Sequence, residues 1–148
     1  MPQIITSIEI AASAEAVWQH LTDFAAYPSW NPFIRSISGP LERGAQLEVT
    51  VQPTGGSPMS FKPRLLACNP GAELRWKGMF LVPGLFDGEH YFQITESKTG
   101  QVLFTHGETF SGLLTGVVLQ GKMKQATEAG FEQMNRALKS RAQANGDA

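Results

Sequence analysis

Three residues in the second half of the chain could transfer protons or anchor a polar group: His90, His106 and Glu108. They share the alternating position of the apolar residues in two predicted strands, so they face the same side of a sheet. A short turn at 97–100 joins the strands. Any pairing that keeps the alternation sets His90 opposite His106 or Glu108, with Cβ atoms about 5 Å apart. We therefore expect all three to point inward and to share one hydrogen-bonded neighbourhood.

The sequence leaves three roles open for this polar trio. Burying a carboxylate and imidazoles costs several kcal/mol unless they are paired or hydrated. The trio could be a structural His–Glu pair near the strand ends, with no ligand. It could be a polar anchor on the floor of a ligand pocket. It could also be an acid–base pair in catalysis, because carboxylates and imidazoles transfer protons near neutral pH.

Recognisable enzyme signatures are missing from the sequence. It contains no G-x-S-x-G elbow, P-loop, dinucleotide fingerprint or H-E-x-x-H motif, so catalytic residues stay unassigned. His20, His90 and His106 have no zinc-ligand spacing with Cys68, and we expect no metal and no cofactor. Cys68 lies beside a predicted turn and is interpreted as a structural thiol.

Two apolar features could border a ligand cavity. The segment 79–86 is mostly apolar although it reads as a loop, so it either packs as a satellite core or forms a lid at a cavity mouth. Trp30 and Phe33 could line the same cavity. Packing beneath the short N-terminal helices is their alternative role.

The spacing of apolar residues predicts the elements that position these side chains. A half-buried strand at 4–10 is followed by a helix with Ser13 as its N-cap. Pro28 is expected to end or kink this helical region before a second short turn runs into Trp30. Alternation then predicts successive antiparallel strands at 46–52, 59–65, 74–77, 90–94 and 102–110.

The C-terminal third changes to a helical period. Apolar residues and glycines recur at helical spacing from Met123 to Leu138, which predicts one long helix from about Thr115 to Arg141. Gly130 would weaken this helix by about 1 kcal/mol relative to Ala. It either allows close packing against the sheet or leaves room for a ligand.

This order predicts an α+β helix-grip fold. A curved antiparallel sheet of about six to seven strands would wrap around the long C-terminal helix, with two short helices after the first strand. We expect one domain over 1–142 and a flexible tail over 143–148. The strand alternation and the helical stripe predict buried and exposed sets. Expected to be buried are Leu47, Val49, Val51, Leu74, Trp76, Phe92, Phe104 and Phe131, and expected to be exposed are Lys62, Arg75 and Lys77.

Length and charge narrow the function classes. The chain has 148 residues and a net charge of −1, which disfavours a nucleic-acid module because such a module needs a basic face. The single cysteine excludes an internal disulfide. No segment reads as a signal peptide or membrane span, so we expect a soluble cytoplasmic protein, either monomer or homodimer.

Three segments resemble the START-like (SRPBCC) superfamily, and within it the polyketide cyclase/dehydrase group. They are 8–18, the Trp30-Asn31-Pro32-Phe33 signature within 27–33, and 108–114 at the junction with the long helix. The resemblance reaches to about residue 142. It implies a cavity between sheet and helix that binds lipids, sterols, polyketides or hormones, and it supplies no shared catalytic triad.

The leading hypothesis is a protein that binds a small hydrophobic ligand such as a lipid, polyketide or aromatic compound. One alternative is a cyclase, dehydratase or hydrolase that uses Glu108 with His90 or His106. Another is a ligand-free protein-interaction module. The candidate ligand-binding residues are Trp30, Phe33, Trp76, Phe86, His90, Phe92, Phe104, His106, Glu108, Phe110, Met123 and Phe131.

Overall fold

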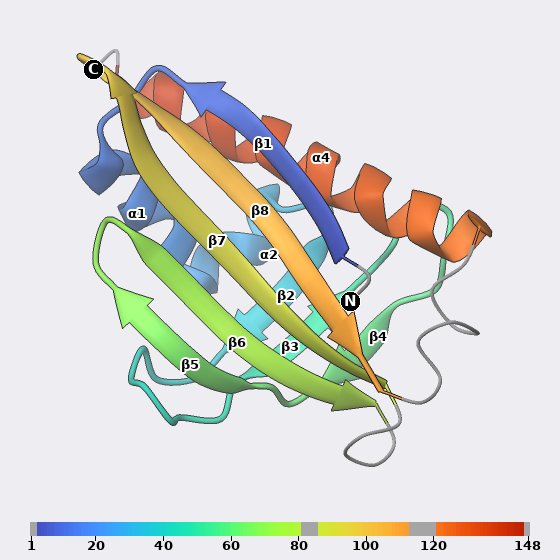
Figure 1. Cartoon of the computed structure of the whole chain (residues 1–148). Coiled ribbons are helices and arrows are strands. Elements are labelled where there is room, and N and C mark those ends of the chain that lie inside the picture. The colour runs from blue at the N-terminus through green and yellow to red at the C-terminus, as the bar shows by residue number, and fades with distance from the viewer. Residues whose placement is uncertain (1–2, 81–85, 113–120, 147–148) are drawn as a thin grey trace.

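The computed structural model describes residues 3–80, 86–112 and 121–146, and within them the chain folds as an α+β protein (Figure 1). The strands are β1 (Gln3–Ile10), β2 (Ile34–Ser38), β3 (Glu48–Val51), β4 (Met59–Phe61), β5 (Arg64–Asn69), β6 (Glu73–Phe80), β7 (Phe86–Lys98) and β8 (Gln101–Ser111). The helices are α1 (Ala14–Thr22), a 3₁₀ turn η1 (Phe24–Ala26), α2 (Tyr27–Trp30) and α4 (Gly121–Gly146).

The described strands form two antiparallel sheets. The larger has the order β1-β8-β7-β6-β5, and the smaller has the order β2-β3-β4. Figure 1 shows α4 lying across one face of the larger sheet beside β1, with α1, α2 and the smaller sheet on the same side. The helix-grip prediction is confirmed, but its single sheet of six to seven strands is replaced by two sheets.

The single strand predicted at 59–65 is wrong. The structure has β4 of the smaller sheet and β5 of the larger sheet there, and Pro63, which has no N–H to donate to a ladder, lies between them.

The strand β2 was not predicted. Its pairing with β3 shifts register between Ile34 and Ser36, which indicates a bulge or a comparable irregularity. The buried residues of β2 are therefore Ile34 and Ile37, which are three positions apart. A spacing of three does not match the period of two by which strands are recognised.

The first helices begin where polar and proline residues favour them. Ser13 caps α1 as predicted, since its Oγ accepts a hydrogen bond from the Ala16 amide at 3.1 Å. Pro28 does not end or kink this helix, because α1 already ends at Thr22. Pro28 lies instead in the first turn of α2, where a missing N–H costs nothing.

Helix α4 supplies the inner wall opposite the larger sheet. Phe131, Met134, Leu138 and Ala142 are fully buried, which confirms the predicted stripe over most of its length. The helix continues to Gly146, so residues 143–146 are helical where a flexible tail was expected. Residues 115–120 of the predicted helix lie outside the described segments.

The predicted core is confirmed for every residue, and the predicted surface is confirmed except at Arg75. All eight residues expected to be buried are buried, and Lys62 and Lys77 are exposed. Arg75 is only half-buried, because its guanidinium contacts Glu73 at 2.6 Å and Glu89 at 2.7 Å. Arg75 also lies 4.6 Å from the centre of the Tyr91 ring. Among the described helices, none combines the length and the hydropathy of a membrane-spanning segment.

Candidate functional site

The pairing of β7 with β8 brings the polar trio together. His90 lies opposite Glu108, and Phe92 lies opposite His106, so the three polar side chains occupy two neighbouring rows of the inner face. His90 is 4% exposed and His106 is fully buried. The predicted inward orientation and cross-strand proximity are therefore confirmed.

A continuous chain of hydrogen-bond contacts runs through the trio to α4 and β1. His90 Nδ1 lies 3.3 Å from Glu108 Oε1, and His90 Nε2 lies 2.8 Å from His106 Nε2. His106 Nδ1 lies 2.9 Å from Asn135 Oδ1. Asn135 Nδ2 donates to Thr6 Oγ1 at 2.8 Å, and the Thr6 hydroxyl donates to the His106 carbonyl at 2.9 Å.

Two members of this hydrogen-bond chain, Asn135 and Thr6, were not among the predicted site residues. Asn135 is 2% exposed and lies one helical turn after Phe131 on the buried stripe of α4. Thr6 shares its strand position with Ile4 and Ile10, which are buried. A polar residue on an apolar stripe is a signal for a buried polar contact, and both residues carried that signal.

Aromatic rings enclose the two histidines. The His106 ring is stacked on Phe131, with centroids 4.0 Å apart and planes 8° from parallel. The His90 ring is stacked on Trp76 at 5.2 Å and 11°, and it lies 6.5 Å from Phe33 at 17°. The interior around His106 is therefore closed and well packed.

Burial governs the protonation of His106. Loss of solvent lowers its pKa well below the usual range, and the neighbouring His90 lowers it further. Hydrogen bonds to Asn135 and to the Phe131 carbonyl act in the opposite direction but are the smaller effects. His106 is therefore a neutral imidazole at neutral pH.

The Glu108 end of the site is more open and incompletely bonded. The Glu108 side chain is 15% exposed, and Oε1 is the oxygen that faces His90. Oε2 occupies the space where a side chain at Gly88 would stand. In the same row, the buried indole N–H of Trp76 has no hydrogen-bond acceptor among the described residues. An indole N–H, a carboxylate and an imidazole thus lie side by side on an otherwise apolar face.

Apart from Trp76, which belongs to the row above, and Phe86, the other predicted site residues divide into three groups. Phe33, Phe92, Phe104, Phe110 and Phe131 are buried in the core around the trio. Trp30 is half-buried and packs edge-on against Tyr27 at 5.2 Å, in agreement with its alternative role beneath the short helices. Met123 is 39% exposed and does not face the trio, since the first turns of α4 lie beside the loop 53–57.

The loop predicted at 79–86 is shorter in the structure, because its ends belong to strands. Met79 and Phe80 belong to β6 and pair with Asp87 and Phe86 of β7. Residues 81–85 and the side chain of Phe86 lie outside the described part of the chain. The lid hypothesis concerns these residues.

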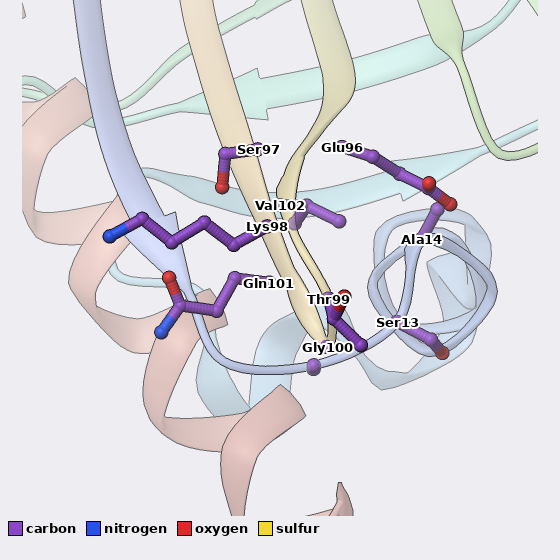
Figure 2. Close-up of a pocket in the computed structure, with 10 residues that line it drawn as sticks. Ser13, Ala14, Glu96, Ser97, Lys98, Thr99, Gly100, Gln101 and Val102 are labelled. Carbon is purple, nitrogen blue, oxygen red and sulfur yellow. The ribbon is translucent and has the colours of Figure 1, made fainter.

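Two open hollows lie near opposite ends of α4. One of about 480 Å³ is bordered by the loop 53–57, Met59, Met123 and Ala126, and its wall is largely apolar. The other, of about 460 Å³, lies between the β7–β8 turn and the start of α1 (Figure 2). Figure 2 shows Lys98 and Gln101 on one side of that turn and Glu96 on the other. The polar trio lines neither hollow.

The arrangement suits proton exchange and hydrogen bonding better than metal binding. The two histidines and Glu108 are bonded to one another, and no group of three potential ligands in the described segments could hold a metal ion. Cys68 is half-buried, and burial raises the pKa of its thiol, which agrees with a structural thiol.

Comparison with solved structures identifies proteins of the same fold. The di-domain ARO/CYC StfQ of the steffimycin biosynthetic pathway superposes with a TM-score of 0.77 at 12% identity, covering 99% of this chain and 52% of that one. This chain thus spans about half of the di-domain protein. A START superfamily protein from Mycobacterium smegmatis gives a TM-score of 0.74 at 22% identity, covering 97% and 98% of the two chains. Ara h 8.0201 gives 0.71 at 14% identity, covering 97% and 99%.

Sequence comparison places the chain in a family. A search of curated proteins returns no match. The family model described as polyketide cyclase/dehydrase and lipid transport matches residues 1–143, which is nearly the whole chain and includes β1, the trio and most of α4. The chain belongs to this polyketide cyclase/dehydrase and lipid transport family.

Proposed function

We propose that this protein binds a small, largely apolar molecule between the larger sheet and α4, with the polar group of the ligand at the row Trp76–His90–Glu108. The observation that carries the proposal is the partly exposed carboxylate of Glu108, which lies beside a buried imidazole on an otherwise apolar face. Membership of the polyketide cyclase/dehydrase and lipid transport family supports a hydrophobic ligand without naming the compound.

The unused hydrogen-bonding capacity of the row supports an anchoring role. A purely structural pair lowers its cost by satisfying every buried polar atom. Here the Trp76 N–H has no acceptor in the described part of the chain, and Glu108 Oε2 lies over Gly88. A ligand oxygen could accept from Trp76 or contact Glu108 and so recover part of this free energy.

The packing around the trio favours Glu108, and not His106, as the residue that meets the ligand. His106 and Phe131 are fully buried and stacked, which leaves no room beside them. Glu108 is the partly exposed member of the trio. The apolar hollow beside the first turns of α4 gives a surface over which an apolar molecule could approach.

A second candidate function is acid–base catalysis at the same row. The observation that favours it is the 3.3 Å contact between His90 Nδ1 and Glu108 Oε1, which joins a carboxyl group to an imidazole within reach of a ligand. Turnover of a bound compound would separate catalysis from binding. The protein-interaction hypothesis has no comparable observation in its favour.

Native mass spectrometry of the purified protein is the first test, because a co-purifying small molecule would identify the ligand. A titration with naphthalene-2-methanol, followed by tryptophan fluorescence, is the second. Glu108→Gln keeps the shape of the side chain and removes its charge, so we expect weaker probe binding with the fold intact. Glu9→Gln removes a carboxylate from the exposed side of β1 and is the matched control.

The two roles of Glu108 predict different results. If Glu108 anchors a ligand, Glu108→Gln weakens binding by about tenfold or more, which corresponds to about 1.4 kcal/mol. If the pair is only structural, the same substitution lowers the melting temperature and leaves probe binding unchanged. Absence of both a co-purifying molecule and probe binding would contradict the proposed function.

A further inference from the structure

We propose that Thr6 and Asn135 polarise the hydrogen-bond chain through both histidines, so that one transferable proton is held between His90 Nδ1 and Glu108 Oε1. The consequence of this proton for the choice of ligand rests on the proposed function. With this proton the site carries no net charge, and it selects an uncharged carbonyl or hydroxyl group over an ammonium or a carboxylate.

Contacts on β1, at the far end of the hydrogen-bond chain, determine which partner donates in each bond. The backbone carbonyl of His106 can only accept, so the Thr6 hydroxyl that contacts it at 2.9 Å donates its single hydrogen there. Thr6 Oγ1 must then accept from its other partner, which is the Asn135 amide nitrogen at 2.8 Å. This contact orients the Asn135 amide and turns Oδ1 toward His106.

The orientation of Asn135 determines which nitrogen of His106 carries hydrogen. Asn135 Oδ1 has no hydrogen, so the 2.9 Å contact requires a hydrogen on His106 Nδ1. The backbone carbonyl of Phe131 also accepts a hydrogen bond from the His106 ring. Because His106 is neutral, its Nε2 has a lone pair and accepts from His90 Nε2 at 2.8 Å.

A proton also lies at the Glu108 end of the hydrogen-bond chain. Since His90 Nε2 carries a hydrogen, a neutral His90 would turn the lone pair of Nδ1 toward the carboxylate 3.3 Å away. Two facing lone pairs repel, so a proton lies between them. The pair is either a carboxylic acid and a neutral imidazole or a carboxylate and an imidazolium, and the sum of its charges is zero in both forms.

The opposite polarity would give a different site. If the Asn135 amide were reversed, each imidazole would donate toward Glu108, and the carboxylate would keep its full negative charge. That site would favour a cationic ligand. In the polarity that Thr6 imposes, a buried ammonium or carboxylate would have no opposite charge to pair with, which costs several kcal/mol. A carbonyl or hydroxyl oxygen needs only the hydrogen bonds that the row offers.

Nuclear magnetic resonance of the ligand-free protein tests the polarity directly. Long-range ¹H–¹⁵N spectra distinguish ring nitrogens that carry hydrogen from those that do not, and the chain has only three histidines. We expect hydrogen on Nδ1 and none on Nε2 of His106, together with hydrogen on Nε2 of His90. Hydrogen on Nε2 of His106 would overturn the inference.

The role of Asn135 as a positioning residue has its own test. Asn135→Leu removes the acceptor at similar volume, so the Nδ1–H form of His106 should lose population. Gln143→Leu removes another side-chain amide of α4, which bonds the Ala11 amide at 2.9 Å, and should leave the His106 spectrum unchanged. If Asn135→Leu fails to fold, Thr6→Val serves instead, because it removes the hydroxyl that orients the Asn135 amide. An unchanged His106 spectrum in a folded variant contradicts the positioning role.

Three probes of nearly the same shape test the consequence for the ligand. They are naphthalene-2-methanol, naphthalene-2-carboxylate and naphthalene-2-methylammonium. We expect the uncharged probe to bind at least about tenfold more tightly than either charged one. Tightest binding of the ammonium would overturn the inference. If no probe binds while His106 carries hydrogen on Nδ1, the proton chain stands and the proposed function fails.

Discussion

Acidification from pH 7 to pH 5 perturbs one buried group in particular, the imidazole of His106. Its side chain is fully buried against Phe131, and its pKa in the folded protein lies well below the ordinary value of 6.5. Below pH 6.5 the unfolded chain binds a proton at this residue that the folded protein does not bind. The free energy of unfolding must therefore fall as the pH falls through this range.

The magnitude follows from the number of protons. One proton bound only by the unfolded state changes the free energy of unfolding by about 1.4 kcal/mol per pH unit. Between the ordinary pKa of 6.5 and pH 5, His106 alone can therefore contribute a loss of at most about 2 kcal/mol. In a domain of this size, such a loss lowers the melting temperature by about 4–8 °C.

Urea denaturation at a series of pH values measures this loss, and variants assign it. His106→Phe keeps an aromatic ring against Phe131 and removes the titrating nitrogens. This variant should be less stable at pH 7, because Asn135 and His90 lose their partner, but its stability should change less with pH. His20→Gln is the control: burial lowers the pKa of His20 as well, but His20 is only half-buried, so the effect should be smaller.

The outcome that would refute this reasoning is an equal loss of stability in wild type and His106→Phe between pH 6.5 and pH 5. Such a result would mean that His106 binds its proton in the folded protein as readily as in the unfolded chain. The buried, neutral imidazole on which the polarity of the hydrogen-bond chain depends would then be wrong.

Three further substitutions test the packing and the helix ends by urea denaturation. Phe131→Ala should cost about 3–5 kcal/mol, because the ring is fully buried, and a loss below about 1 kcal/mol would show that it borders open space. Ser13→Ala should cost about 1 kcal/mol through loss of the α1 cap, and no change would contradict the capping contact. Gly130→Ala should give a net loss of up to about 2 kcal/mol. The new Cβ would lie 2.5 Å from Phe33 Cδ1, and the cost of this clash should exceed the gain in helix propensity. A stabilised variant would show that the Phe33 ring moves aside freely.

Local patterns in the sequence were sufficient for the inner face of β7 and β8. Side chains alternate strictly along a strand, so one buried residue such as Phe92 determines the side on which His90 lies. The short turn before Gln101 leaves few registers, and pairing His90 with Glu108 is one of the two that were expected. The Ser13 cap and the stripe of α4 were predictable for the same reason, since each depends on residues a few positions apart.

Contacts between distant segments could not be predicted in the same way. Asn135 meets His106 across 29 positions and Thr6 across 129, and no local period connects them. Arg75 lies on the predicted outward side, yet Glu73 and Glu89 hold it half-buried through pairings that exist only in the assembled sheet. The irregular register of β2 likewise depends on its pairing with β3.

By itself, the sequence determined most of the elements, the inward direction of His90, His106 and Glu108, and the helix-grip order. Each of these follows from periodicity within one segment or across one short turn. The tertiary structure alone decided the polarity of the buried chain. Hydrogen-bond direction is set by the acceptor at the end of the chain, and α4 must cross the sheet before Asn135 can reach both Thr6 and His106.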